Sequence, residues 1–479
     1  MAAAETTAVR AVASGHPEAA QVGLEALAAG GSAVDAALAM AFTQWVVNGP
    51  LCGPGGDLFL MYADGDDVTV FGGWSRVPLG FPVEGPITAS GPTAAVVPGA
   101  LAGAHAAWRA AGRLSWQELL VPAIARSSGH AVTPWMAKSY ASVVDRGHGA
   151  ALAAFLEQPN PPAAGDSVAC RPLGRTLERI AEHGALELYD GQLGQELVKA
   201  AAEAGGYLST EDLAAVQAAE TPASVHTFPD LTVAVPGAPS QGGIVPRLVA
   251  AAPADADPGS DAFAEATANV IERELTDRCV VGVPGTAASV ATDGVGVAAV
   301  VHSLAGVQFG SGWVAGDSGV AFGNRVGTSL STRADLPAAN PQPGAVLPHT
   351  LSAALLRDGD RTMMVATPGG DRQVQWLAQS AQRFRLGADA PAVATGPRWF
   401  VCPEGDRFGV PGGIGQEWFM FAEPGIEWSN RDRVAGYAVR RMESVGGGLQ
   451  VAACTRGRWT VASDPRSGGA ALVEGGADV

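Results

Sequence analysis

Residues 283–296 read VPGTAASVATDGVG, and this stretch places a threonine directly after a glycine at the predicted start of a β-strand. A threonine hydroxyl is a weak nucleophile unless a base removes its proton. The threonine's own α-amino group, with an unperturbed pKa near ~8, can be that base once the backbone is cut in front of it. Gly285 tolerates the strained backbone that such self-cleavage requires. The stretch therefore predicts cleavage between Gly285 and Thr286, with an ordinary strand or turn threonine as the alternative.

The composition limits the class of protein. The chain has 479 residues, of which 47% are hydrophobic and 16% are charged, so it can bury a large core. The formal net charge is −17 and Lys138 and Lys199 are the only lysines, so we expect no nucleic-acid partner. No apolar run has the length needed to cross a bilayer, and the first residues lack the pattern of a secretory signal. We therefore expect no membrane association and a cytoplasmic location.

Cysteine and metal-ligand patterns point to a protein without bound groups. The five cysteines are far apart and odd in number, which argues against a disulfide framework. No paired ligands occur at short helical or CxxC spacing. We expect no metal and no organic cofactor.

Helical and strand patterns alternate in blocks along the chain, which favours a layered α/β architecture. Residues 15–47 hold two helical patterns that Gly30 and Gly31 separate. Residues 58–62 (LFLMY) and 68–73 (VTVFGG) flank turn residues and predict a hairpin at the edge of a sheet. Residues 252–260 (APADADPGS) predict an exposed linker.

Several motifs follow one another over nearly the whole chain. They are GGSAVDAA (30–37), CGPGGDLF (52–59), YDGQLGQELV (189–198), GGYLSTEDL (205–213), PGAPSQGG (236–243) and FGSGWVAGDSGVAFGNR (309–325). In content and order they resemble the γ-glutamyltranspeptidase superfamily of N-terminal-nucleophile hydrolases. Counting back from FGSG, the family's nucleophilic threonine falls on Thr286. The resemblance implies an α/β (α+β) fold, a four-layer αββα sandwich, with residues 1–285 as larger and 286–479 as smaller subunit, interwoven in one core.

The resemblance also implies the chemistry around the threonine. Gly369 and Gly370 would form the oxyanion hole with their backbone N–H groups. Where γ-glutamyl enzymes hold the α-amine of the substrate, the matching positions lack an acidic partner. The motifs CGPGGDLF (52–59), SRVP (75–78), GNR (323–325), LPHT (347–350) and GGDRQ (369–373) are instead similar to the branch that includes oxamate amidohydrolase. That branch implies a small amide or acyl substrate with its own carboxylate.

Five residues are the candidates for holding this substrate. Arg76 and Arg325 are the predicted clamps for its carboxylate, because a guanidinium can grip a carboxylate through two parallel hydrogen bonds. A structural or surface ion pair is the alternative for each arginine. His349 is predicted to orient the substrate or to pack in the core, and Thr350 and Asp371 are further candidate contacts.

Other residues near the threonine carry less favourable predictions. His302 and Ser303 are interpreted as structural. Relatives carry a hydroxyl and a polar residue where Leu304 and Gly306 stand, and bulkier residues where Ala287 and Ala288 stand. These differences predict weaker positioning of the nucleophile.

The leading prediction is a self-processing N-terminal-threonine hydrolase that cleaves an amide or related acyl bond in a small carboxylated substrate, in secondary metabolism. Three alternatives stay open. The same fold could cleave a carbon–carbon bond to an oxalyl-like group, the chain could be an uncleaved pseudoenzyme that binds or scaffolds, or it could act on γ-glutamyl compounds. The expected partner is a small molecule with a carboxylate, and the expected assembly is a heterodimer of the chain's own two fragments or a homo-oligomer.

Overall fold

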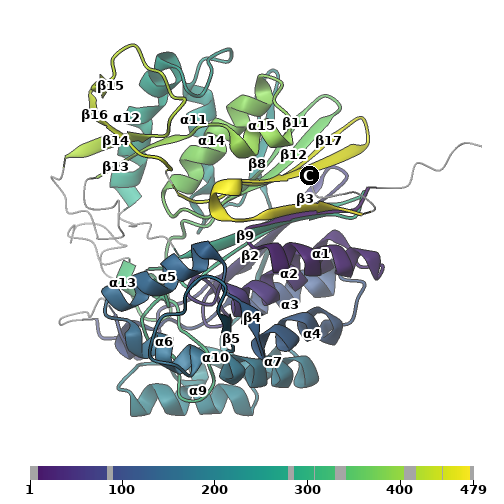
Figure 1. The fold of residues 1–479 in the computed structure, drawn as a ribbon, viewed down its shortest axis with the longest axis vertical. Helices are drawn as coiled ribbons and strands as arrows, with labels where there is room; N and C mark the ends of the chain where they lie inside the picture. Colours follow the sequence, from purple (N-terminus) through teal and green to yellow (C-terminus); the bar gives the residue numbers. More distant parts are fainter. Residues whose placement is uncertain are drawn as a thin grey trace, which may run out of the picture.

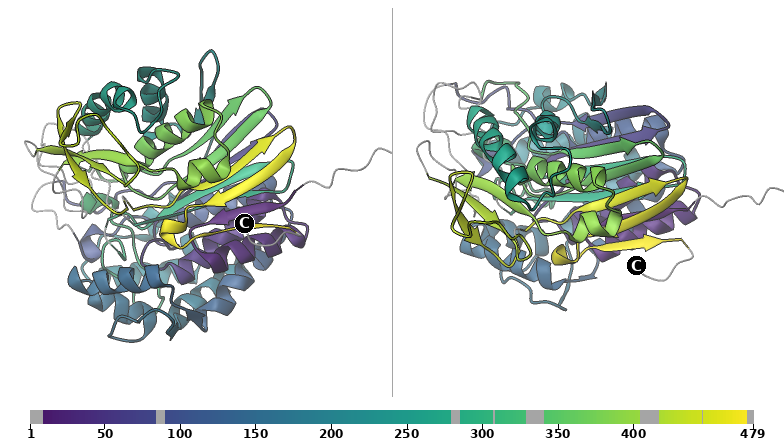
Figure 2. Two further views of the ribbon diagram at one scale, coloured as in Figure 1. Left: turned by 45° about the horizontal axis from the view of Figure 1, so that its top comes forward. Right: turned by 90° about the horizontal axis from the view of Figure 1, so that it is seen from above.

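Two β-sheets lie face to face in the computed structural model, with helices on both outer sides (Figure 1). The structure describes residues 9–83, 90–278, 285–306, 308–328, 341–403, 417–444 and 446–474. The layers follow the order helix, sheet, sheet, helix, and Figure 2 shows the same stacking from two further directions. The predicted four-layer αββα sandwich is confirmed.

The first sheet has the strand order β19-β1-β9-β10-β2-β3-β6, and every neighbouring pair is antiparallel. Its strands are β1 (Ala11–Ser14), β2 (Asp57–Asp64), β3 (Asp67–Gly73), β6 (Ala219–Pro222), β9 (Thr286–Thr292), β10 (Val297–Ser303) and β19 (Ala470–Val473). Strands from before and after the predicted cleavage point share this sheet, because β9 and β10 lie between β1 and β2. The division into subunits at residue 285 stays a prediction.

The second sheet has the order β18-β17-β12-β11-β8-β7. Its strands are β7 (Ser224–Thr227), β8 (Thr232–Val235), β11 (Ala353–Asp358), β12 (Arg361–Ala366), β17 (Gln450–Thr455) and β18 (Arg458–Ser463). Two small sheets accompany the sandwich. They consist of β13 (Trp399–Pro403), β14 (Trp418–Ala422), β15 (Arg433–Val434) and β16 (Tyr437–Arg441), and of β4 (His130–Ala131) and β5 (Ser167–Val168).

The helices divide between the two outer layers (Figure 1). Those on the side of the first sheet are α1 (Pro17–Ala28), α2 (Ala33–Val47), α3 (Ala100–Ala111), α4 (Trp116–Ser127), α5 (Pro134–Asp145), α6 (Gly149–Leu156), α7 (Arg171–His183), α8 (Leu186–Tyr189), α9 (Gln192–Glu203) and α10 (Thr210–Ala214). Those on the side of the second sheet are α11 (Ile244–Ala251), α12 (Asp261–Arg278), α14 (Arg372–Arg385) and α15 (Ala390–Thr395). The short α13 (Arg325–Thr328) precedes β11. Within the described ranges, no helix combines the length and the apolar character that crossing a bilayer requires.

The core explains why β9 carries apolar side chains on both of its faces. Apolar side chains from both sheets pack between them, and a second cluster packs between the first sheet and its helices. Along β9, Ala288 and Val290 belong to the first cluster, whereas Ala287 and Ala291 belong to the second. Because alternate residues of a strand face opposite sides, a strand that is covered on both sides carries apolar residues on both faces.

One expectation about local structure is wrong and another holds in part. The predicted hairpin exists as β2 and β3, but it is not at the edge of a sheet, because β2 pairs with β10 and β3 pairs with β6.

Residues 252–260 connect α11 to α12 and are partly exposed, as predicted, but other elements hold their backbone. The Gln382 amide donates to the carbonyl oxygens of three of these residues at 2.8–3.0 Å, and Trp399 Nε1 donates to the Pro258 carbonyl at 2.7 Å.

Candidate active site

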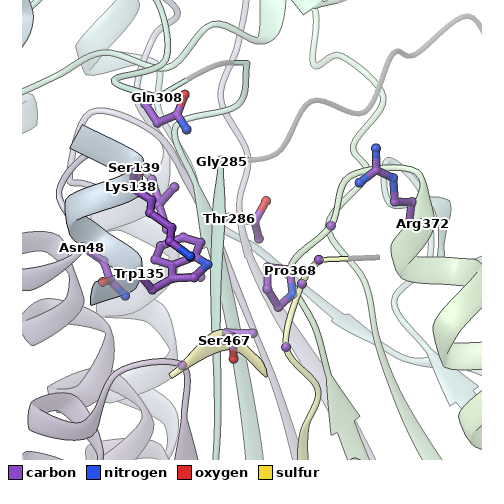
Figure 3. Close-up of a pocket in the computed structure, with 18 of the residues that line it drawn as sticks. Asn48, Trp135, Lys138, Ser139, Gly285, Thr286, Gln308, Pro368, Arg372 and Ser467 are labelled. Carbon is purple, nitrogen blue, oxygen red and sulfur yellow. The ribbon is translucent and has the colours of Figure 1, made fainter. Parts of the chain in front are cut away.

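Thr286 is the first residue of β9 and lies at the wall of a cavity of about 390 Å³ (Figure 3). Its side chain is largely enclosed, with 5% of the residue exposed. Residues of α5 form one side of this cavity, and Pro368, the chain neighbour of the lining residue Gly369, lies on the opposite side. The cavity also contains Gly285, so both residues of the predicted cleavage point border it.

The hydroxyl of Ser303 connects the two residues of the cleavage point. Ser303 is the last residue of β10 and lies opposite Thr286 in the antiparallel pair. Thr286 Oγ1 donates to Ser303 Oγ at 3.4 Å, and Ser303 Oγ donates to the Gly285 carbonyl oxygen in a short hydrogen bond. The Ala305 N–H donates to Ser303 Oγ at 2.8 Å and holds it in place. A donor on the Gly285 carbonyl stabilises the negative charge that nucleophilic attack on this carbonyl creates.

Ser303 contacts both residues of the predicted cleavage point, so the structure makes it a candidate site residue where the sequence indicated a structural one. Leu304 carries no hydroxyl, but the β9–β10 register places the hydroxyl of Ser303 opposite Thr286. Leu304 instead is fully buried in the core on the helix side, and its N–H donates to the Leu51 carbonyl at 2.8 Å.

Gly369 shares the cavity with Thr286, whereas Gly370 is not among its lining residues. Both have a positive φ, +138° and +59°. A Cβ on Gly369 would lie 2.4 Å from the ring of Trp376, so this position accepts only glycine. Within the described ranges, neither glycine N–H donates to another protein group. Their role as oxyanion donors stays a prediction.

Behind Thr286, a buried polar chain joins β10 to α2 and β1. Trp45 Nε1 donates to His302 Nδ1 at 3.1 Å, so the other ring nitrogen carries the proton and donates to Gln44 Oε1 at 2.8 Å. The Gln44 amide, which lines the cavity, donates to Ser14 Oγ at 3.1 Å. Burial lowers the pKa of His302 to about 3, so the ring is neutral near pH 7.

Arg325 and His349 meet around a carboxylate that the sequence analysis did not single out. Arg325 Nη2 lies 3.0 Å from Asp57 Oδ2, and His349 Nε2 lies 3.6 Å from Asp57 Oδ1. Burial opposes ionisation of Asp57, but His349, Arg325 and the hydrogen bonds from Ser75 together hold its pKa below the ordinary value. Arg325 therefore makes a structural ion pair, which was the alternative to its predicted role as an anion clamp. The role as a clamp stays a prediction.

The remaining predicted substrate contacts also lie outside the cavity lining. The half-buried Arg76 donates from Nη1 to the Gly344 carbonyl at 3.4 Å. The Thr350 carbonyl accepts a hydrogen bond from the Gln241 amide at 2.9 Å. Asp371 is buried at the start of α14. The structure brings Gly285, Thr286 and Gly369 together and places Arg76, Arg325, His349, Thr350 and Asp371 elsewhere.

The sequence of the chain agrees with this geometry. Residues 19–253 and 260–474 match the family described as Gamma-glutamyltranspeptidase. The chain belongs to the gamma-glutamyltranspeptidase family. Its fold is that of the N-terminal-nucleophile hydrolases of this family.

Curated members of the gamma-glutamyltranspeptidase family match over part of their length. Glutathione hydrolase 3 of Arabidopsis thaliana is 31% identical over 206 residues, which are 40% of this chain and 32% of that protein. The glutathione hydrolase proenzyme of Escherichia coli (strain K12) is 30% identical over 251 residues, which are 49% of this chain and 43% of that protein. The matched segments thus cover less than half of these relatives.

A solved structure matches over nearly the whole chain. The cephalosporin acylase from Bacillus halodurans superposes with a TM-score of 0.82 at 22% identity, covering 97% of this chain and 96% of that one. At this identity the likeness establishes the shared fold.

The charged residues of the cavity were not predicted. Its polar and aromatic lining consists of Gln44, Asn48, Trp135, Lys138, Ser139, Gln308, Arg372, Ser444 and Ser467 beside Thr286. This described lining contains a lysine and an arginine but no acidic side chain. Among the described residues, no group of three or more His, Cys, Asp or Glu side chains could hold a metal ion. The groups that the cavity offers for chemistry are therefore hydroxyls, amides and cations.

Proposed function

We propose that this chain is a self-cleaving N-terminal-threonine hydrolase that cleaves an amide or related acyl bond in a small substrate carrying a carboxylate. The observation that carries the proposal is the position of the Ser303 hydroxyl, which bonds both to Thr286 Oγ1 and to the Gly285 carbonyl oxygen. Membership of the gamma-glutamyltranspeptidase family supports the reaction class.

Self-cleavage involves the Thr286 hydroxyl, the Gly285 carbonyl and the Ser303 hydroxyl, which are in contact. Thr286 Oγ attacks the Gly285 carbonyl carbon and gives up its proton, while Ser303 donates to the oxygen that becomes negative. The bond between the Gly285 carbon and the Thr286 nitrogen then breaks, and the nitrogen takes up the proton. An ester now joins Gly285 to the Thr286 oxygen. Water hydrolyses this ester, which leaves a carboxylate on Gly285 and a free α-amino group on Thr286.

Turnover then repeats the attack on an external carbonyl. The α-amino group of Thr286 accepts the proton of its own hydroxyl, and Oγ attacks the acyl carbon of the substrate. The Gly369 N–H, together with that of Gly370, stabilises the oxyanion. The leaving amine takes the proton and departs, and water hydrolyses the resulting ester to release the acid and restore the threonine.

The cavity favours a substrate other than a γ-glutamyl compound. A γ-glutamyl group carries an ammonium, and burying it without an acidic partner is costly. The described lining provides Lys138 and Arg372 but no carboxylate. This charge pattern supports a carboxylated substrate without an ammonium.

The proposal is tested by intact-mass analysis of freshly purified protein beside a Thr286→Ala variant. We expect the wild-type chain to separate into fragments ending at Gly285 and beginning at Thr286, while the variant stays whole. An active preparation with a different new N-terminus would contradict the mechanism. If both proteins stay whole after long incubation, the self-cleavage proposal fails and the uncleaved binding or scaffold protein becomes the leading hypothesis. Ammonia or oxalate release from small carboxylated amides then separates amide hydrolysis from carbon–carbon cleavage.

A further inference from the structure

One face of α5 forms the wall of the cavity opposite Pro368 (Figure 3). Trp135, Lys138 and Ser139 all line the cavity, and all three belong to α5. Residues three and four positions apart lie on the same face of an α-helix, so the spacing itself directs these three side chains together. This face thus presents an aromatic ring, an ammonium and a hydroxyl toward the space beside Thr286.

Lys138 is one of only two lysines in this acidic protein. The chain has a net charge of −17. Within the described ranges, no carboxylate lies within ion-pairing distance of the Lys138 ammonium, whereas Lys199 lies 3.8 Å from Glu203. Because the described lining of the cavity also lacks acidic side chains, the positive charge of Lys138 is not neutralised locally. An anion in the cavity would be attracted to it.

Ser139 provides a second and independent indication of a ligand. The residue is 6% exposed, and its Oγ has no hydrogen-bond partner among the described residues. A buried hydroxyl without a partner is costly, and most serine side chains within a helix that are not solvated bond to a backbone carbonyl of the preceding turn. Asn48, on α2's side of the same cavity, likewise has a buried Oδ1 without a partner in the described part of the chain. The cavity thus holds polar atoms that a bound molecule would satisfy.

We propose that α5 is the subsite for the carboxylate of the substrate, with Lys138 Nζ and Ser139 Oγ donating hydrogen bonds to it. The ring of Trp135, 39% exposed, packs against the apolar part of the same molecule. The inference rests on the proposed function of the cavity and assigns the carboxylate to α5 in place of Arg76 and Arg325. The substrate class is a monocarboxylic acid amide with an apolar or aromatic segment.

The two lysines allow a direct test that needs no turnover. Reductive ¹³C-dimethylation keeps the charge of a lysine and gives one NMR signal for each, and Lys138→Met identifies the signal of Lys138. N-phenylsuccinamic acid and its uncharged counterpart N-phenylbutanamide are the probes. We expect the acid to shift the Lys138 signal in a saturable manner and to leave the Lys199 signal unchanged. The uncharged amide should shift neither.

Calorimetry on unmodified protein gives the second measurement. Lys138→Met should weaken binding of the acid about tenfold, since a charge-assisted hydrogen bond is lost. Ser139→Ala should weaken it several-fold, and Lys199→Met serves as the matched control without effect. Equal shifts of both lysine signals, or unchanged affinity in Lys138→Met, would overturn the proposal.

The outcome is separable from that of the proposed function. The titration is also run on the full-length Thr286→Ala variant, in which the peptide bond between residues 285 and 286 stays intact. If the wild-type chain never cleaves but the acid still shifts the Lys138 signal, the hydrolase proposal fails and the anion subsite stands. If the chain cleaves but the signal does not respond, the subsite fails alone.

Discussion

Replacement of Ser303 should slow self-cleavage without preventing folding. Its hydroxyl donates to the Gly285 carbonyl, where negative charge develops during self-cleavage. Loss of a comparable oxyanion donor slows reactions by about 10²–10³-fold. We therefore expect Ser303→Ala to fold normally and to form fragments about a hundredfold more slowly, as followed by intact mass over time.

Ser289 is the matched control for this experiment. It is buried in the same strand as Thr286, and its hydroxyl donates to Ser14 Oγ at 3.0 Å, away from the cleavage point. Ser289→Ala removes an equally buried hydroxyl and should cleave at the wild-type rate. Equal cleavage rates in the two serine variants would show that the hydrogen bond to Gly285 does not contribute.

The residue pattern indicated Thr286, which the structure places at the cavity, and it contained a signal for Ser303 as well. In the β9–β10 hairpin Thr292 lies opposite Val297, so counting away from the turn along both strands brings Thr286 opposite Ser303. Lys138 offered no such signal, because contact between α5 and the cavity depends on packing between distant segments.

At the scale of elements, the ion pair between Asp57 and Arg325 ties the start of β2 to α13. Both side chains are buried, so removal of one partner leaves an uncompensated charge. We expect Asp57→Asn and Arg325→Met each to lower the free energy of unfolding by about 3–5 kcal/mol, measured by urea denaturation. In the double variant, the free energy of unfolding should fall by less than the sum of the two single decreases.

The exposed pair between Arg357 and Asp66 is the control, because Arg357→Met should cost less than about 1 kcal/mol. If Arg325 instead clamps the substrate, as the sequence suggested, Arg325→Met would abolish activity at nearly unchanged stability.

Two buried histidines make the stability dependent on pH. Burial lowers the pKa of His302 to about 3. Burial, together with the nearby His130 and Arg126, also lowers the pKa of His16 to about 3. In the unfolded chain the pKa is near 6.5, so between these values the unfolded state binds more protons than the folded state. Stability is therefore fully present above pH 6.5 and is lost as the pH falls toward 3.

Each histidine should reduce the unfolding free energy by up to about 1.4 kcal/mol per pH unit in this window. Urea denaturation between pH 7.5 and about 4 measures the slope. His302→Gln should reduce the slope by the contribution of one histidine, up to about 1.4 kcal/mol per pH unit, because glutamine does not titrate. A wild-type stability that is flat from pH 6.5 downward would contradict the buried neutral state of both rings.

At the scale of the whole molecule, the first sheet should hold the two cleavage fragments together. It contains strands from both sides of residue 285, because β9 pairs with β1 and β10 pairs with β2. We expect the fragments to elute as one species in size-exclusion chromatography and to separate only in denaturant. Separation under native conditions would show that the two parts are not interwoven.

The four-layer fold could be predicted because its motifs run in order over nearly the whole chain. The details that failed depend on tertiary contacts. The hairpin of β2 and β3 is internal because β6 and β10 come from distant parts of the sequence. Residues 252–260 have a polar, proline-rich composition, but Gln382 and Trp399 bond to their backbone from other elements. Local composition cannot reveal such partners.

The position of β9 inside the first sheet affects whether the cleaved protein can refold after it has unfolded. The proposed cut lies at the start of β9, which pairs with β1 and β10, so cleavage is expected only after these pairs have formed. Afterwards the native state is no longer in equilibrium with a single unfolded chain, because refolding requires two separate polypeptides to find each other. Its lifetime would then depend on the barrier to unfolding and on protein concentration, so that a molecule unfolded once in dilute solution would be lost for good.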